Sequence, residues 1–103
     1  MRKIAIICGG YSGEYEISIK SAHVVKKHLD SNVYDSYLIV IKKGEWYCLM
    51  DDDTHIPVDK NDFSVTIDGN KITFDAVFNA VHGIPGENGE ILGYFEMMNI
   101  PYT

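Results

Sequence analysis

Residues 9–21 read Gly-Gly-Tyr-Ser-Gly-Glu-Tyr-Glu-Ile-Ser-Ile-Lys-Ser, and they follow directly on the apolar run Ile4-Ala5-Ile6-Ile7-Cys8. A continuous apolar run is typical of a buried strand in a parallel sheet. The glycines that follow it predict a loop into a helix, where main-chain N–H groups lack partners within the helix. Glycine also lets a ligand approach the main chain closely. The stretch therefore predicts a strand, a loop and a helix, with a candidate binding site at the loop.

The residues that follow extend this unit. From Glu16 to about Leu29, small and apolar residues recur at the spacing of one helical face; they are Ser18, Ala22, Val25 and Leu29. A second β-rich run, Tyr37–Ile41, comes after this helix. A right-handed crossover through the helix should make the two strands parallel.

The second half of the chain predicts peripheral antiparallel strands and then a second strand, glycine loop and helix. Residues 45–50 predict a short antiparallel strand, and residues 65–67 and 71–73 predict a peripheral hairpin around Asp-Gly-Asn. The run 75–81 predicts a third parallel strand that again ends in a glycine loop. A second helix then places Ile91, Phe95 and Met98 on one face, and Asn99 and Pro101 end it before a further extended segment. This order predicts an α/β, Rossmann-like three-layer domain with a mainly parallel sheet, spanning residues 1–103 as one unit.

Composition narrows the class of function. The chain has 103 residues, of which 46% are hydrophobic and 23% charged, as expected for a single globular domain. Its 15 acidic and 9 basic side chains give a net charge of -6, which disfavours a nucleic-acid partner. The two cysteines, Cys8 and Cys48, have neither disulfide nor zinc-site spacing and are expected to be reduced and buried. The apolar run after Met1 is too short for a signal peptide or a membrane span, so we expect a cytoplasmic protein with no membrane partner.

Two loops are expected to share one edge of the sheet. Loops that leave the carboxyl ends of parallel strands meet at a crevice, which brings Glu14 and His82 toward one cavity. Glu14 could capture a ligand ammonium, or it could only complement the positive end of the helix dipole. His82 could be held in one tautomer by Glu87 while its other nitrogen meets a substrate oxygen, or it could be a structural histidine.

Other polar residues receive no role. His23 and His28 lie on different helix faces, and His55 is expected in a polar loop. Asp51-Asp52-Asp53 lacks the spaced ligands of a calcium loop and is expected to be a solvated turn. The remaining apolar candidates, Trp46, Tyr47 and Met50, are expected to pack under the hairpin.

The two glycine motifs together resemble one known family. Gly9-Gly10-x-Ser12-x-Glu14-x-x-Ile17-Ser18-x-x-Ser21 and His82-Gly83-x-x-Gly86-Glu87-x-Gly89 resemble the N-terminal domain of D-alanine–D-alanine ligases, an ATP-grasp family. The closing Gly93-x-x-Glu96-x-x-x-Ile100-Pro101-Tyr102-Thr103 is similar too. One departure is Leu92, where family members commonly carry glutamine. The family's enzymes continue past this segment into ATP-grasp domains, which this chain lacks.

The resemblance implies a pre-ATP-grasp fold and a set of roles. The complete enzyme would phosphorylate the carboxylate of one D-alanine with ATP and let a second D-alanine attack the acyl phosphate, making the dipeptide used in peptidoglycan. Glu14 would anchor the ammonium of the first substrate, His82 would orient its carboxylate side, and Glu87 would support them. Ile17, Ser18 and Gly83 would line the pocket. ATP and Mg²⁺ or Mn²⁺ would be held by the missing domains and none by this chain, which would be inactive alone; the complete enzyme would be a homodimer.

Two other readings stay open at this point. A dehydrogenase nucleotide-binding domain would explain the strand, glycine loop and helix, although Gly-Gly-x-x-Gly departs from G-x-G-x-x-G and Lys42-Lys43 ends the second strand where an acid is expected. A flavodoxin-like, non-catalytic binding module is also compatible, because a fold alone does not fix chemistry.

Overall fold

A computed structural model describes residues 2–10, 15–80 and 90–102 of the chain. The first strand, β1 (Arg2–Gly9), leads to helix α1 (Tyr15–His28) and to strand β2 (Tyr34–Lys42). β1 and β2 pair in parallel, with Ile6 opposite Leu38 and Cys8 opposite Val40. The predicted β-α-β unit is therefore confirmed, with strands one to three residues longer at each end than the apolar runs that indicated them.

The main sheet has five strands in the order β4-β3-β2-β1-β7. β7 (Ala76–Asn79) lies parallel to β1, whereas β3 (Glu45–Leu49) and β4 (His55–Pro57) are antiparallel additions beyond β2. A separate two-stranded sheet consists of β5 (Val65–Ile67) and β6 (Asn70–Ile72). The second helix is α2 (Glu90–Met97), and the extended segment after it places Tyr102 in a parallel bridge with Val77 of β7.

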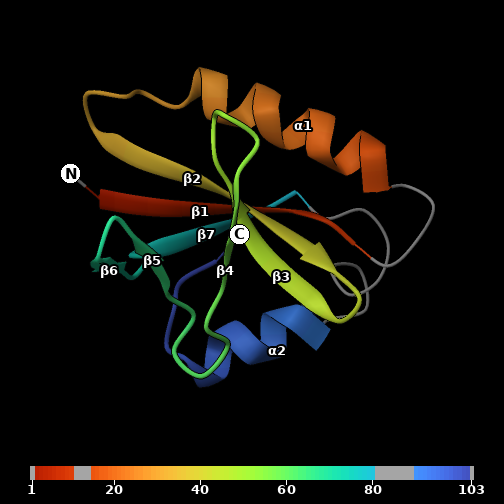
Figure 1. The fold of residues 1–103 in the computed structure, drawn as a ribbon, viewed down its shortest axis with the longest axis vertical. Helices are drawn as coiled ribbons and strands as arrows, with labels where there is room; N and C mark the ends of the chain where they lie inside the picture. Colours follow the sequence, from red (N-terminus) through yellow and green to blue (C-terminus); the bar gives the residue numbers. More distant parts are fainter. Residues whose placement is uncertain (1, 11–14, 81–89, 103) are drawn as a thin grey trace.

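The sheet separates two apolar layers, with α1 on one face and α2 on the other (Figure 1). Side chains along β1 alternate between the faces, so that Ile6 and Cys8 pack toward Ala22 of α1 while Ala5 and Ile7 join the cluster around Phe95 of α2. β2 alternates in the same way. This arrangement explains why both strands read as unbroken apolar runs, and it confirms the three-layer α/β fold.

The hairpin is separate from the main sheet, as predicted, but it contributes side chains to the hydrophobic core. Phe63, which leads into it, and Val65 within it are 0% and 1% exposed and belong to the cluster on the α2 face. The ring of Phe63 lies 4.9 Å from that of Phe95 and 5.3 Å from that of Phe74, measured between centroids. The segment therefore covers part of the sheet that the eight-residue α2 leaves open.

Two predictions about residues beside this segment are wrong. His55 does not lie in a loop: it belongs to β4, and its ring stacks on that of Tyr47 with centroids 3.9 Å apart. Tyr47 itself packs on the α1 face of the sheet and not under the hairpin, because its neighbour Trp46 takes the opposite face against Phe63. The alternation of a strand places adjacent residues on opposite sides, which the sequence prediction had not applied here.

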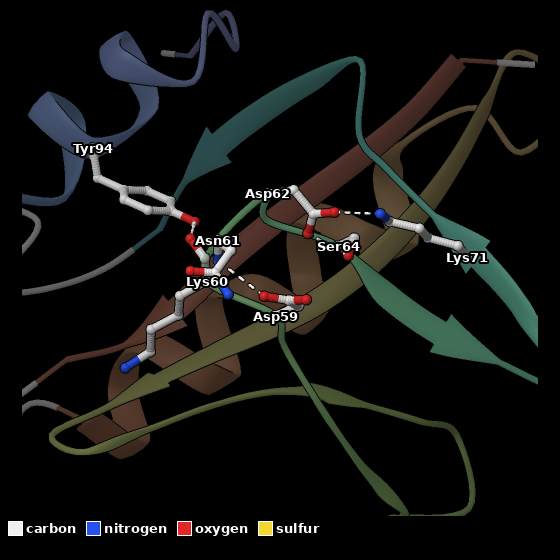
Figure 2. A network of polar contacts seen from close by, with 7 residues as sticks. All are labelled: Asp59, Lys60, Asn61, Asp62, Ser64, Lys71 and Tyr94. Carbon is white, nitrogen blue, oxygen red and sulfur yellow. Dashed lines mark hydrogen bonds and ion pairs between the residues drawn. The ribbon is translucent and has the colours of Figure 1, made fainter.

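Contacts of the 59–64 loop fasten α2 to the hairpin (Figure 2). The Tyr94 hydroxyl of α2 donates to the Lys60 carbonyl oxygen at 2.5 Å, and the Lys60 ammonium lies 4.9 Å from the centroid of a Trp46 ring. On the other side, Asp62 accepts from the Ser64 hydroxyl at 2.6 Å and forms an ion pair with Lys71 of β6. The middle of α2 is thus tied to the 59–64 loop, and this loop is tied to β6.

Candidate functional site

The carboxyl ends of β1 and β7 form the point where the chain changes direction across the sheet. From β1 the chain continues to α1 on one face, and from β7 it continues to α2 on the other face (Figure 1). Adjacent parallel strands whose connections leave to opposite faces open a crevice at their carboxyl ends, and this is where open α/β sheets bind ligands. The candidate site therefore lies at these two strand ends, as the sequence predicted.

Ser18, in the first turn of α1, joins the two strand ends. Its hydroxyl oxygen accepts a hydrogen bond from the Gly9 N–H at 2.9 Å, and the hydroxyl donates to the Ala80 carbonyl oxygen at 2.5 Å. The residue is 0% exposed, as is Ala22 one turn later, so small side chains let α1 approach the sheet closely. A larger residue at either position would push the helix away from the strand ends.

The main chain beyond β1 turns toward β2. Gly9 and Gly10 have φ values of 92° and 116°, which L side chains rarely adopt, and the Gly10 N–H donates to the Ile41 carbonyl oxygen at 2.8 Å. On the other strand, the Ala80 N–H donates to the Ile7 carbonyl oxygen at 2.9 Å. The glycine pair is therefore required by the turn that the chain makes at the end of β1.

The predicted site residues fall into two groups. Ile17 is 59% exposed on α1, where it can meet a ligand or another part of a larger protein, whereas Ser18 is buried and bonded to main chain on both sides. The other predicted residues, Glu14, His82, Gly83 and Glu87, lie outside the described residues. The structure thus brings together the strand ends from which both loops start, and the approach of Glu14 to His82 stays a prediction.

The sequence predicts Ser18 on the buried face of the helix, and the resemblance places it in the pocket lining, but neither predicts its link between two strands. The sequence does carry a partial signal, because a serine on the buried helix face beside Ala22 needs hydrogen-bond partners. Spacing could not show that those partners are Gly9 and Ala80, since they come from strands that are distant in the sequence.

Neither Cys8, near the end of β1, nor Cys48, in β3, has the lowered pKa of a nucleophilic thiol. Burial raises the pKa of Cys8 to about 12, and burial raises that of Cys48 to about 11 although Lys26 lowers it. Both thiols are free and buried, as predicted, and remain protonated near neutral pH. Within residues 2–10, 15–80 and 90–102, no three His, Cys, Asp or Glu side chains gather to hold a metal ion.

Three cavities lined by described residues lie away from the carboxyl ends of β1 and β7. One of about 190 Å³ is lined by Ile4, Tyr34 and Ala76, which stand at the amino ends of their strands. Another of about 200 Å³ lies beside Lys26, Ser36 and Cys48. A third, of about 380 Å³, lies beside Met50, Thr54 and Ile67. None of the three is lined by Gly9, Ser18 or Ala80, so the strand ends remain the candidate site on the parallel-sheet rule. No helix in the described part is long and apolar enough to span a membrane.

Comparison with known proteins identifies relatives over the whole chain. The family described as "D-ala D-ala ligase N-terminus" matches residues 3–103. A D-alanine–D-alanine ligase of Christiangramia forsetii is 52% identical over 102 residues, covering 99% of this chain and 31% of the relative. The chain therefore spans about 31% of the length of this curated relative.

Solved structures show the same fold. D-alanyl-alanine synthetase A of Vibrio cholerae superposes with a TM-score of 0.82 at 30% identity, covering 99% of this chain and 30% of that one. The D-Ala:D-Ser ligase of Enterococcus faecalis gives 0.81 at 32% identity, with coverages of 98% and 35%. A D-alanine–D-alanine ligase of Bacillus anthracis, complexed with ATP, gives 0.67 at 27% identity, with coverages of 100% and 29%. These relatives favour neither the dehydrogenase nor the binding-module alternative.

Proposed function

The chain belongs to the family of D-Ala D-Ala ligase N-terminal domains, and on that premise we propose that residues 1–103 are the substrate-binding domain of a longer ATP-dependent ligase. That enzyme joins two D-alanines through an acyl phosphate and supplies the dipeptide for peptidoglycan. The family match over residues 3–103 carries the proposal. The arrangement of β1 and β7 supports it, because their connections lead to opposite faces of the sheet and open α/β sheets bind ligands at such strand ends.

In this proposal the two loops hold the first D-alanine at both charged ends. Glu14 binds its ammonium group, His82 orients its carboxylate side and Glu87 supports the imidazole. Ile17 and Gly83 line the pocket, and Ser18 is buried at the strand ends from which the two loops start. A substrate fixed in this way presents its carboxylate oxygen in line with the γ-phosphate of ATP, and such positioning supplies most of the rate in phosphoryl transfer. The acidic loop and the imidazole therefore position the nucleophile and leave the phosphate to other domains.

ATP and the metal belong to the remainder of the enzyme in this proposal. The Bacillus anthracis relative was solved with ATP, which supports ATP as the phosphoryl donor. The described residues offer no three-carboxylate or histidine group for Mg²⁺ or Mn²⁺, so we assign them no part in holding it. The complete enzyme is proposed to be a cytoplasmic homodimer, and the chain alone to be inactive.

Kinetics of the complete protein encoded by the gene test the proposal. With D-alanine and ATP, the wild type should release phosphate and form D-alanyl-D-alanine. Glu14→Gln and His82→Ala should each lower kcat/KM for D-alanine by about 100-fold or more, because an anchoring charge or the orienting group is lost. Glu16→Gln is the matched control, since Glu16 is an exposed acid in the first turn of α1 and its substitution should leave kcat/KM unchanged.

Two results would reject the proposal. One is a wild-type protein that forms no D-alanyl-D-alanine, and the other is full activity in both Glu14→Gln and His82→Ala. Competition between D-alanine, D-serine and D-lactate as second substrate then defines the product, because the fold is shared with a D-Ala:D-Ser ligase.

A further inference from the structure

The hydrogen-bond ladder between β1 and β7 ends one step before the crevice. Its last residue pair is Ile7 with Asn79, and its last bond runs from the Ala80 N–H to the Ile7 carbonyl oxygen at 2.9 Å. In a parallel ladder, every second residue of a strand bonds to the two residues that flank its partner on the neighbouring strand. On β1, Ile7 is such a residue toward β7, and the next one is Gly9. One further step would therefore make the Gly9 N–H donate directly to the Ala80 carbonyl oxygen.

The Ser18 hydroxyl occupies the place of this next ladder bond. It accepts from the Gly9 N–H and donates to the Ala80 carbonyl oxygen, the same two groups that the ladder would join. The Ser18 residue is 0% exposed, so water does not compete for these bonds. Both main-chain groups are satisfied, but the two strands are separated by two hydrogen bonds in series instead of one of about 2.9 Å.

The two loops of the site start at the atoms that Ser18 holds. Three residues lie between Gly10 and Glu14 in the sequence, and one lies between Ala80 and His82. The Gly10 N–H bonds to the Ile41 carbonyl oxygen, so the end of β1 stays paired with β2. The distance that can vary at this point is therefore the one between the ends of β1 and β7. Any change in that separation moves the starting points of both loops relative to each other.

We propose that Ser18 is a positioning residue which, by replacing a sheet hydrogen bond with its hydroxyl, holds β1 and β7 apart and so sets the width of the D-alanine crevice. This inference rests on the proposed function for its substrate. It gives Ser18 a role through the main chain, without contact between its side chain and D-alanine. Removal of the hydroxyl lets the Gly9 N–H bond directly to the Ala80 carbonyl oxygen and narrows the crevice.

Steady-state kinetics of Ser18→Ala in the complete protein test the proposal. We expect the KM for D-alanine to rise about tenfold or more while the KM for ATP stays within about twofold, because only the D-alanine site changes shape. Ser64→Ala is the matched control: Ser64 is 3% exposed and its hydroxyl also bonds, but it lies in the 59–64 loop, so only stability should fall.

An unchanged KM for D-alanine in Ser18→Ala would overturn the proposal, as would a parallel change in the KM values for D-alanine and ATP. If Ser18→Ala does not fold, Ser18→Cys carries the same kinetic test, because a thiol of similar size bonds more weakly.

A crystal structure of the Ser18→Ala variant separates this inference from the proposed function. We expect Gly9 N and Ala80 O at about 2.9 Å, the length of a direct bond. The wild-type separation, with or without a water in place of the hydroxyl, would overturn the inference. This measurement needs no ligase activity, so it stands even if the wild-type protein forms no D-alanyl-D-alanine and the proposed function is rejected.

Discussion

Phe63 combines complete burial with a left-handed main chain. Its φ is 52°, a region that costs a residue with a Cβ about 1–2 kcal/mol, yet its side chain is 0% exposed. Ring contacts with Trp46, Phe74, Tyr94 and Phe95 offset that strain. The conformation persists because the aromatic contacts on the α2 face are worth more than the local preference of the main chain.

Glycine should be tolerated better than alanine at position 63. Both Phe63→Ala and Phe63→Gly lose the ring, at about 3–5 kcal/mol, but glycine relieves the left-handed strain. We therefore expect Phe63→Gly to be more stable than Phe63→Ala by about 1 kcal/mol in urea unfolding. Phe74, a buried ring whose φ is not positive, is the control, and there alanine should be the more stable replacement. The same order at both positions would contradict this account of Phe63.

The two buried thiols should make stability fall at alkaline pH. Burial raises the pKa of Cys8 from its ordinary 9.0 to about 12 and that of Cys48 to about 11, so the folded state retains protons that the unfolded chain releases. This stabilisation is complete below pH 9 and is lost as pH rises toward 11–12. Between pH 9 and 10 the thiols dominate, because the tyrosines begin from an ordinary pKa of 10.0.

The urea midpoint measured from pH 8 to pH 10 checks this expectation. We expect it to fall above pH 9 in the wild type and to fall less in a Cys8→Ala, Cys48→Ala double variant. Peptide mass spectrometry after thiol labelling at pH 8 should find both cysteines unmodified in the folded protein and modified in urea. Labelling of either cysteine at equal rates in both conditions would contradict the burial that raises these pKa values.

At the scale of elements, the sequence predicted the helices and strands that have a local signature of their own. β1, α1, β2 and β3 follow from their periodicity, and the hairpin follows from its Asp-Gly-Asn turn. β4 was missed because His55-Ile56-Pro57 has no β signature of its own and is held by pairing with β3. The burial of Phe63 was missed because it stands between Asp62 and Ser64, where only a long-range contact can reveal a core position.

The candidate site divides in the same way. The alternation of strands and helices predicted that β1 and β7 are parallel, and the structure confirms this pairing. That the site lies at their carboxyl ends stays a prediction from the parallel-sheet rule. The bonds of Ser18 could not be predicted, since a hydroxyl on a helix face can meet any strand that passes within reach. The roles of Glu14 and His82 stay predictions.

Helix α2 should be held to the 59–64 loop in part by the hydroxyl of Tyr94. It has eight residues, too few for a helix to be stable alone, so its contacts with the 59–64 loop matter. Tyr94→Phe keeps the rings around Phe63 but removes the bond to the Lys60 carbonyl, and we expect a loss of about 1 kcal/mol. Faster amide exchange at Asp59 and Ser64, whose N–H groups bond across the loop, should accompany it.

Tyr102→Phe is the control for this change. Its hydroxyl donates to Glu96 of the same helix at 2.7 Å, but the bond is exposed and does not reach the loop. An equal effect of both substitutions on the exchange of Asp59 and Ser64 would show that the Tyr94 hydroxyl does not hold the loop.

For the whole molecule, one sheet carries two apolar layers that do not touch each other. Phe63 and Phe95 belong to the layer on the α2 face, while Tyr47 belongs to the layer on the α1 face. Strands β1 and β2 contribute to both, so the layers should unfold together in one transition even though their side chains are independent. Packing energies should therefore couple within a face and add across the sheet.

Double-mutant cycles in urea unfolding measure this arrangement. Phe63→Leu with Phe95→Leu removes two rings whose centroids are 4.9 Å apart, and we expect a coupling energy of about 0.5–1.5 kcal/mol. Phe63→Leu with Tyr47→Leu pairs residues on opposite faces, and their effects should add within about 0.3–0.5 kcal/mol. Equal coupling in both cycles would mean that the sheet transmits side-chain repacking from one face to the other. In that case α1, and with it Ser18 at the crevice, would respond to changes beneath α2, and the width of the candidate site would depend on both layers.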